Sequence, residues 1–320
     1  MRRRALEKEF PVFIERALMN IPDMQTDIKE LLREKNAILL AHYYQRGEIQ
    51  DVADILGDSL ALSMEAAKTD AEVIVFAGVQ FMAESAAILS PDKTVLLPVL
   101  EAGCPLADKI TLEQLKRAKE EHPDAVVVTY VNSSAETKAE SDICCTSGNA
   151  VRVIGSIDAE EILMVPDGNL ARYTARFTSK KVIPWQGFCY VHNQLSVADI
   201  EQVKGRFPKA LLAVHPECAE AVIDRADFVG STAGIIEFAA KTDAREIIVG
   251  TEMGIMHQLE KRNPEKTFIP ASEHLICRDM KKIRLEDIHD SLREMKHVVT
   301  VPEEVRVPAY RALERMLSIP

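Results

Sequence analysis

Three stretches of this sequence share one pattern, and together they decide the fold: NAILLAHYYQ (36–45), DAVVVTYVNSS (124–134) and KALLAVHPECA (209–219). Each is a short apolar run, rich in β-branched residues, that ends in polar and aromatic side chains. Such runs are typical of buried strands. The register is close, because 88 residues separate His42 from Tyr130 and 85 residues separate Tyr130 from His215. A repeat of this period predicts three similar structural units.

The elements that follow each run recur in the same register. A Gly/Ser/Thr turn opens a helix-like stretch in each unit, at GDSLALSMEAAK (57–68), CTSGNAVRVI (145–154) and GSTAGIIEFAAK (230–241). Strand-like segments follow at AEVIVFAG (71–78), EEILMVPD (160–167) and REIIVGTE (245–252). The last segments all end in cysteine, namely KTVLLPVLEAGC (93–104), KKVIPWQGFC (180–189) and KTFIPASEHLIC (266–277). Chance similarity within a single Rossmann-like domain is therefore the weaker interpretation.

Helices with start signals separate these units, at TDIKELLREK (26–35), TLEQLKRAKEEHP (111–123) and SVADIEQVKGRFP (196–208). Thr111 with Gln114, and Ser196 with Asp199, fit a capping box. A fourth copy at 284–301 predicts another helix and a strand. Strands that alternate with helices predict parallel sheets.

We therefore expect an α/β fold of three similar parallel-sheet domains related by a pseudo-threefold axis, with terminal helices. The expected division is an N-terminal helical extension (1–25), a first unit (26–110), a second unit (111–195), a third unit (196–283) and a C-terminal helix and strand (284–320) that closes on the first unit.

Composition narrows the class of protein. The chain has 320 residues and a formal net charge of −11, which argues against a nucleic-acid partner. No apolar run approaches the roughly 18 residues of a membrane span, and no apolar segment follows the basic residues 1–10 as it would in a secretory signal. We expect a cytoplasmic protein with no membrane contact. Its six cysteines, which form no CxxC pair, are then thiols or metal ligands.

The repeat predicts where a ligand binds. In open parallel sheets, ligands bind beyond the carboxyl ends of the strands. The polar residues expected there are His42, Tyr43, Tyr44, Tyr130, Asn132, His215 and Glu217. Ser59, Ser147 and Ser231/Thr232 are expected at helix starts, where free N–H groups attract anions, although ordinary N-capping would also place them there. Packing around a pseudo-threefold axis would bring all these positions to one central cavity.

The same packing would bring three thiols together, because Cys104, Cys189 and Cys277 end equivalent segments. Three thiolates at one point suit an iron–sulfur cluster or a zinc ion. A cubane cluster with three cysteine ligands leaves one iron open, as a Lewis acid needs. A buried inert thiol is the alternative for any single cysteine. Cys144, Cys145 and Cys218 have no matched partners, and we interpret them as packing residues near the cavity.

Long motifs in this sequence closely resemble the quinolinate synthase A family of NAD biosynthesis, over residues 25 to 300. They are AHYYQ (41–45), GDSLALS (57–63), YVNSSAETKAESDICCTSGNA (130–150), HPEC (215–218), GSTAGI (230–235) and TEMGI (251–255). The resemblance implies three α/β domains around one 4Fe–4S cluster with three cysteine ligands, Cys104, Cys189 and Cys277, and one open iron. It also implies condensation of iminoaspartate with dihydroxyacetone phosphate to quinolinate, with loss of phosphate and water.

The resemblance also implies roles for single residues. Substrate would be bound by His42, Ser59, Tyr130, Val131, Asn132, Ser147, His215, Pro216, Glu217 and Thr232. The catalytic set would be Glu217, Tyr44, Tyr130 and His215, with Glu217 as general base. We expect burial and like charge to raise the pKa of Glu217. Met280 stands where some family members carry a second cysteine, so no disulfide switch is expected.

Two other functions compete with this one. A different 4Fe–4S hydro-lyase acting on a small hydroxy acid could use the same three cysteines. An iron–sulfur redox sensor is the non-enzymatic alternative, although three sets of cavity residues would be superfluous for it. A transient contact with the enzyme that supplies iminoaspartate is compatible with the resemblance.

Overall fold

The computed structural model describes residues 20–319, so most of the helical extension expected over 1–25 lies outside the described residues. The first described helix, α2 (Ile21–Glu34), begins five residues before the stretch predicted at 26–35. Its buried side chains recur every fourth residue, at Met24, Ile28 and Leu32. That spacing gives the helix one apolar face, and full burial of an aliphatic side chain stabilises the fold by about 1.5–3 kcal/mol.

Three parallel four-stranded sheets form the framework, which confirms the predicted α/β class. The first contains β1 (Ala37–His42), β2 (Ile55–Gly57), β3 (Val73–Ala77) and β4 (Thr94–Leu96). The second contains β5 (Val126–Tyr130), β6 (Ile143–Cys145), β7 (Glu161–Val165) and β8 (Lys181–Pro184). The third contains β9 (Leu211–Val214), β10 (Phe228–Val229), β11 (Glu246–Gly250) and β12 (Thr267–Pro270). The strand order β2-β1-β3-β4 recurs as β6-β5-β7-β8 and β10-β9-β11-β12, which makes the three units alike.

Helices connect the strands of each unit and pack on the sheets. The first unit has α3 (Gly47–Gln50), α4 (Ser59–Lys68) and α5 (Gln80–Leu89). The second has the 3₁₀ turn η1 (Ala107–Lys109), α6 (Leu112–Glu121), α7 (Ala135–Ala139), α8 (Ala150–Ser156), α9 (Gly168–Ala175) and α10 (Tyr190–Asn193). The third has α11 (Val197–Arg206), α12 (Glu220–Ile223), α13 (Thr232–Lys241) and α14 (Ile255–Arg262). Both predicted capping boxes, at Thr111 and Ser196, are present.

The sequence analysis missed one strand in every sheet. β2, β6 and β10 are edge strands of two or three residues, too short to show a period-2 pattern. An aspartate just before each of them binds a backbone N–H of the neighbouring strand. These bonds run from Leu39 N to Asp54 Oδ2 (2.8 Å), Val127 N to Asp142 Oδ2 (2.8 Å) and Leu212 N to Asp227 Oδ2 (2.7 Å). The same carboxylate–amide bond is therefore part of the fold of all three units.

The C-terminal segment differs from its prediction. α15 (Leu285–Glu294) forms as expected and packs on α2, but the strand predicted after it does not form. Val298 makes only an isolated antiparallel bridge to Leu96 at the edge of β4. A further helix, α16 (Glu303–Leu317), packs on α7, β6 and α5, and so contacts the second unit as well as the first. The residue numbers at which one unit ends and the next begins stay a prediction.

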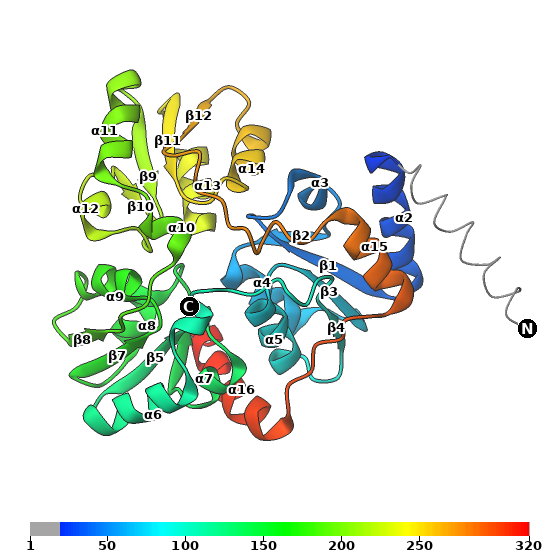
Figure 1. The fold of residues 1–320 in the computed structure, drawn as a ribbon, viewed down its shortest axis with the longest axis horizontal. Coiled ribbons are helices and arrows are strands. Elements are labelled where there is room, and N and C mark those ends of the chain that lie inside the picture. Colours follow the sequence, from blue (N-terminus) through cyan, green and yellow to red (C-terminus); the bar gives the residue numbers. More distant parts are fainter. Residues whose placement is uncertain (1–19, 320) are drawn as a thin grey trace, which may run out of the picture.

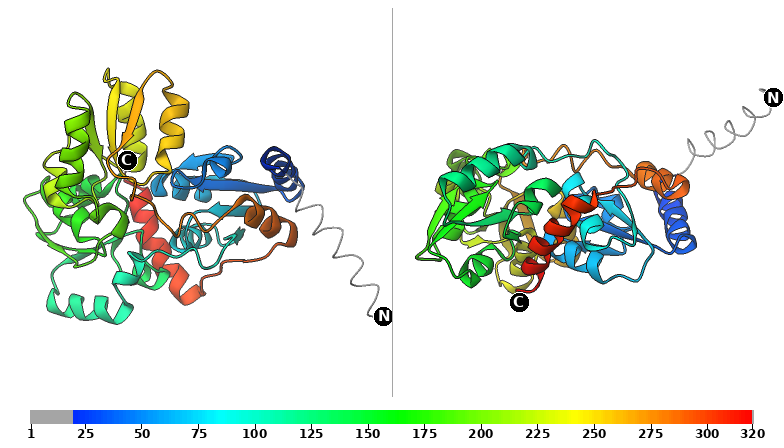
Figure 2. Two further views of the ribbon diagram at one scale, coloured as in Figure 1. Left: turned by 45° about the horizontal axis from the view of Figure 1, so that its top comes forward. Right: turned by 90° about the horizontal axis from the view of Figure 1, so that it is seen from below.

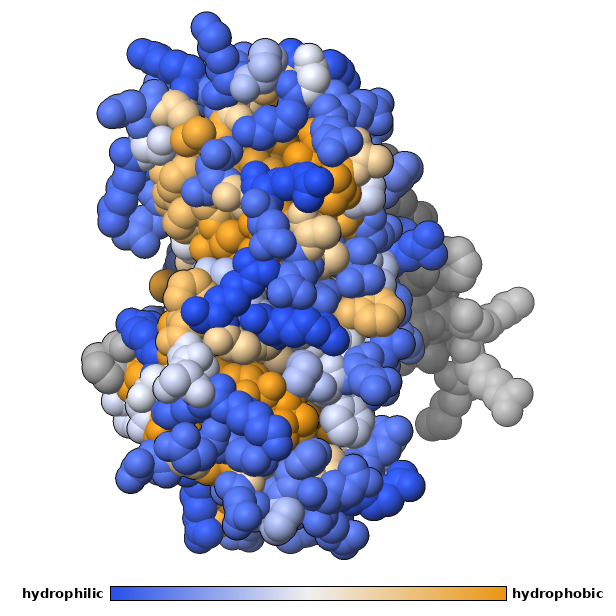
Figure 3. Space-filling model, turned by 90° about the vertical axis from the view of Figure 1, so that its left-hand side faces the viewer, coloured by the Kyte–Doolittle hydropathy of each residue, from blue (hydrophilic) through white to orange (hydrophobic). Residues whose placement is uncertain are grey.

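The three units surround a common centre, with α16 running between the first and second units (Figures 1 and 2). The face formed by the second and third units is mostly hydrophilic, with apolar patches between the polar side chains (Figure 3). No helix in residues 20–319 is long and apolar enough to cross a membrane.

Candidate active site

A cavity lies where the three units meet, with a lining drawn from all of them. Of the residues selected from the sequence, twelve line it: His42, Tyr44, Ser59, Cys104, Tyr130, Asn132, Ser147, Cys189, His215, Glu217, Thr232 and Cys277. Every unit contributes, because the carboxyl ends of β1, β5 and β9 all point towards this centre. The predicted convergence is therefore present in the structure.

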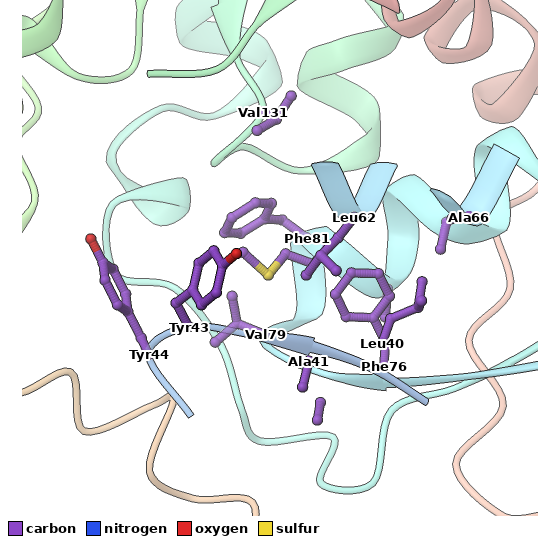
Figure 4. Close-up of a cluster of buried hydrophobic side chains, with 14 of the residues drawn as sticks. Leu40, Ala41, Tyr43, Tyr44, Leu62, Ala66, Phe76, Val79, Phe81 and Val131 are labelled. Carbon is purple, nitrogen blue, oxygen red and sulfur yellow. The ribbon is translucent and has the colours of Figure 1, made fainter. Parts of the chain in front are cut away.

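Four candidate residues do not line the cavity. Tyr43 packs with Val79 and Phe81 in the core, and Val131 lies at the edge of this hydrophobic cluster (Figure 4). The Tyr44 hydroxyl, by contrast, points away from the cluster. Pro216 and Ser231 also lie outside the lining. For Tyr43, the structure favours the plain core role.

The helix-start residues divide into two kinds. Ser59 and Thr232 are the first residues of α4 and α13, so their N–H groups lie at helix N-termini. Ser147 does not begin a helix, because α8 starts only at Ala150. Instead, Asn149 Oδ1 accepts the Thr146 N–H at 2.7 Å and holds a tight turn that presents Ser147 to the cavity.

A chain of close polar contacts links all three units beside the cavity. The Tyr44 hydroxyl lies 2.6 Å from Thr251 Oγ1 and 2.8 Å from Thr232 Oγ1. Thr251 Oγ1 lies 2.8 Å from His192 Nε2, and His192 Nδ1 lies 2.6 Å from Glu217 Oε2. The sequence analysis missed His192 and Thr251. Thr251 directly follows β11, where parallel sheets bind ligands, and that position could have revealed it.

Glu217 is ionised, contrary to our expectation of a raised pKa. Burial does push the pKa of this carboxyl upwards. The imidazoles of His215 and His192 and a hydrogen bond from Tyr130 outweigh burial and hold the pKa at about 2. Glu217 Oε1 and Asn132 Oδ1 are buried without a hydrogen-bond partner within the described chain, so both are available to a ligand.

Two histidines at equivalent positions are neutral donors. Burial is the main reason that the pKa values of His42 and His215 fall to about 3. His42 Nδ1 accepts the Tyr44 N–H at 3.1 Å, and His215 Nδ1 accepts the Glu217 N–H at 3.3 Å. A neutral imidazole that accepts at Nδ1 carries its proton on Nε2. Both rings can therefore donate to a negatively charged ligand.

Anion binding here depends on dipoles rather than on cations. None of the described residues that line the cavity is Lys or Arg. The nearby Lys281 contacts the buried Glu252 carboxylate at 3.0 Å, which neutralises its charge. Helix N-termini, hydroxyls and imidazole N–H groups are the donors that remain for an anion.

The three repeat cysteines line the cavity as free thiols. Burial raises the pKa of each, to about 12 for Cys104, so their protons are displaced only when a metal binds. Backbone N–H groups two or three residues further on face the sulfurs: those of Leu106 and Ala107, of His192, and of Asp279 and Met280. Cys144, Cys145 and Cys218 are fully buried and do not line the cavity.

The spacing of the thiols bears on the kind of metal. Three His, Cys, Asp or Glu side chains could hold one metal ion when their ligand atoms all lie within 4.8 Å of one another. Among residues 20–319, one group meets this criterion: Cys189, His192 and Glu217. The three cysteine sulfurs are therefore spread more widely. A single zinc ion with Zn–S bonds of about 2.3 Å would need sulfurs about 3.8 Å apart. The cysteines thus fit a cluster in which each thiolate binds a different iron.

Comparison with known proteins agrees with this geometry. The profile of the family described as "Quinolinate synthetase A protein" matches residues 26–318. "Quinolinate synthase" of Geotalea uraniireducens is 57% identical over 93% of this chain and 98% of its own length. "Quinolinate synthase 1" of Methanosarcina acetivorans is 54% identical, covering 94% and 99%, and "Quinolinate synthase" of Alkaliphilus metalliredigens is 51% identical, covering 94% and 100%. The chain therefore belongs to the quinolinate synthase A family.

Proposed function

We propose that this chain, as a quinolinate synthase, condenses iminoaspartate with dihydroxyacetone phosphate and releases quinolinate, inorganic phosphate and water. The observation that carries this proposal is the cavity in which anion-binding donors from three units and three free thiols come together. We place the reaction in the cytoplasm, because free thiols persist in a reducing compartment.

We propose Cys104, Cys189 and Cys277 as the ligands of one 4Fe–4S cluster. Their spacing and the backbone N–H groups that face their sulfurs support this choice. Such N–H groups are common around cluster sulfurs and tune the cluster. When bound, the cluster supplies an open iron that acts as a Lewis acid on a substrate oxygen.

The two carboxylates of iminoaspartate are matched by donors on the cavity wall. Ser59 and Thr232 offer hydroxyls at the N-termini of α4 and α13. His42 and His215 offer Nε2–H groups, and their neutral state avoids a costly buried cation when the site is empty. Binding by fixed dipoles orients the substrate, because each donor is held by its own element.

Glu217 is our general base for removing the proton from the substrate carbon that forms the new bond. A pKa of about 2 makes this carboxylate a weak base in the empty site. The entering dianion would raise that pKa through like charge, and so would strengthen the base when substrate is bound. Tyr130 and His192, which contact the carboxylate, are placed to hold it in one orientation.

The test is quinolinate formation by anaerobically purified protein supplied with both substrates. Glu217→Gln should lower the rate by about 10²- to 10⁴-fold with iron and sulfide content unchanged. Glu220→Gln, three residues further on and exposed, is the matched control and should behave as wild type. Full activity in Glu217→Gln would remove Glu217 as the base. Phosphate released without iminoaspartate would contradict the condensation.

A further inference from the structure

One position has the same backbone in the three units but a different type of side chain. It is the second residue after the third strand of the repeat, occupied by Val79, Asp167 and Glu252. In every unit the next residue donates its N–H to the carbonyl two residues before the cysteine. These bonds run from Gln80 to Ala102 (2.7 Å), from Gly168 to Gly187 (2.8 Å) and from Met253 to Leu275 (2.8 Å). The backbone at this position is thus equivalent in all three units.

The two carboxylates bind the cysteines directly. Asp167 Oδ2 accepts the Cys189 N–H at 3.1 Å, and Glu252 Oε1 accepts the Cys277 N–H at 3.0 Å. The second oxygen of each carboxylate binds its own turn: Asp167 Oδ1 accepts the Leu170 N–H at 2.7 Å, and Glu252 Oε2 accepts the Gly254 N–H at 2.6 Å. Both side chains are completely buried. Each therefore ties a cysteine loop to the end of a central strand.

The fold does not require a carboxylate here. The first unit builds the same turn and the same backbone bond with Val79. By contrast, the aspartates that bind a strand N–H, Asp54, Asp142 and Asp227, occur in all three units. Burying a carboxylate is costly unless it is well hydrogen-bonded. Asp167 also caps α9 and Glu252 also pairs with Lys281, but the first unit builds the equivalent turn with neither contact.

We propose that Asp167 and Glu252 are positioning residues that fix Cys189 and Cys277 as metal ligands. This inference rests on the proposed cluster at the three cysteines. A carboxylate oxygen that accepts the cysteine N–H limits movement of the loop that carries the sulfur. Outer partners of metal ligands act in this way, by orienting the ligand and tuning the metal.

The experiment compares wild type with Asp167→Asn and Glu252→Gln, all purified anaerobically. Asp142→Asn is the matched control, because it loses a carboxylate–amide bond of the second unit away from the cavity. We measure iron and acid-labile sulfide, the rate of iron release to a chelator, and the cluster midpoint potential. Asp167→Asn and Glu252→Gln should release iron about 10- to 100-fold faster than wild type. Their midpoint potentials should differ from that of wild type, because the group that orients each cysteine ligand has changed.

Asp167→Val and Glu252→Val supply a second pair of variants, since the first unit shows that the turn accepts valine. These should unfold at about the same denaturant concentration as Asp142→Asn, yet release iron as fast as the amide variants. Release rates and potentials equal to those of wild type, in a wild type that holds iron and sulfide, would overturn this inference alone. A wild type without iron and sulfide would overturn both this inference and the proposed cluster.

Discussion

The Tyr44 hydroxyl is predicted to tie the first unit to the third, and removing it should cost both stability and activity. In Tyr44→Phe, the hydrogen bonds to Thr251 (2.6 Å) and Thr232 (2.8 Å) are lost together. A net hydrogen bond contributes about 0.5–1.5 kcal/mol, so the free energy of unfolding should fall by about 1–3 kcal/mol. Both threonines are buried, so water does not replace the lost partner easily.

The assay is urea unfolding of the metal-free protein, followed by circular dichroism, in a double-mutant cycle with Thr251→Val. The coupling energy between the two substitutions should be about 0.5–1.5 kcal/mol, the value of the shared hydrogen bond. Tyr43→Phe is the control, since the Tyr43 hydroxyl makes no hydrogen bond to any residue between 20 and 319. A coupling energy near zero, or an equal loss in Tyr43→Phe, would refute the reasoning.

Three further predictions follow from the structure. Gly187→Ala should destabilise the protein by more than about 2 kcal/mol and lower its iron content, because the new Cβ would lie 2.2 Å from the Pro166 carbonyl oxygen. The control is Gly155→Ala, whose Cβ would have no atom within 4 Å; it should be neutral or slightly stabilising in the same urea assay. The pKa of His42 is lowered to about 3 in the folded protein, so the unfolded chain binds the proton at higher pH. The free energy of unfolding should therefore fall as the pH drops from 6.5 towards 3, and should fall less steeply in His42→Gln. An unchanged slope in His42→Gln would contradict a neutral imidazole. Iron and sulfide analysis should find about four of each per wild-type chain, and the control variant Cys218→Ser should keep this content. The content should fall when Cys104, Cys189 or Cys277 is replaced by serine, and a serine variant at any of these positions that keeps its iron and sulfide would refute the assignment.

Local patterns were enough to predict most of the framework. All strands except β2, β6 and β10, the helices α4, α8 and α13 and both capping boxes were expected from apolar runs, turn residues and capping pairs. These features are encoded within a few neighbouring residues. The short edge strands and α16 were not expected. An edge strand of two or three residues is stabilised mainly by its neighbour in the sheet, and α16 by packing on elements far away in the chain.

The candidate site was predictable to the extent that it follows the repeat. Matched positions in three units pointed to His42, Tyr130 and His215, and to the cysteines, and the structure brings all of them to one cavity. His192 belongs to no obvious repeat and was missed. Thr251 lies in a repeated segment but was also missed, because the other two units have Gly78 and Pro166 at its position. The first unit also has Val79 where the other two units have the buried carboxylates Asp167 and Glu252, a difference that was not noticed in the sequence.

The threefold repeat, the α/β class and the residues that end each strand could all be predicted from residue order, because they depend on local patterns. Which side chains meet is a property of the folded chain: Tyr44 and Thr251 are 207 residues apart in the sequence, yet share a hydrogen bond. The folded chain also sets the charge of Glu217, because His192 and Tyr130, from other elements, act with the neighbouring His215 to outweigh its burial. Electrostatic energies depend on distance and surroundings in space, and neither is written in the order of residues.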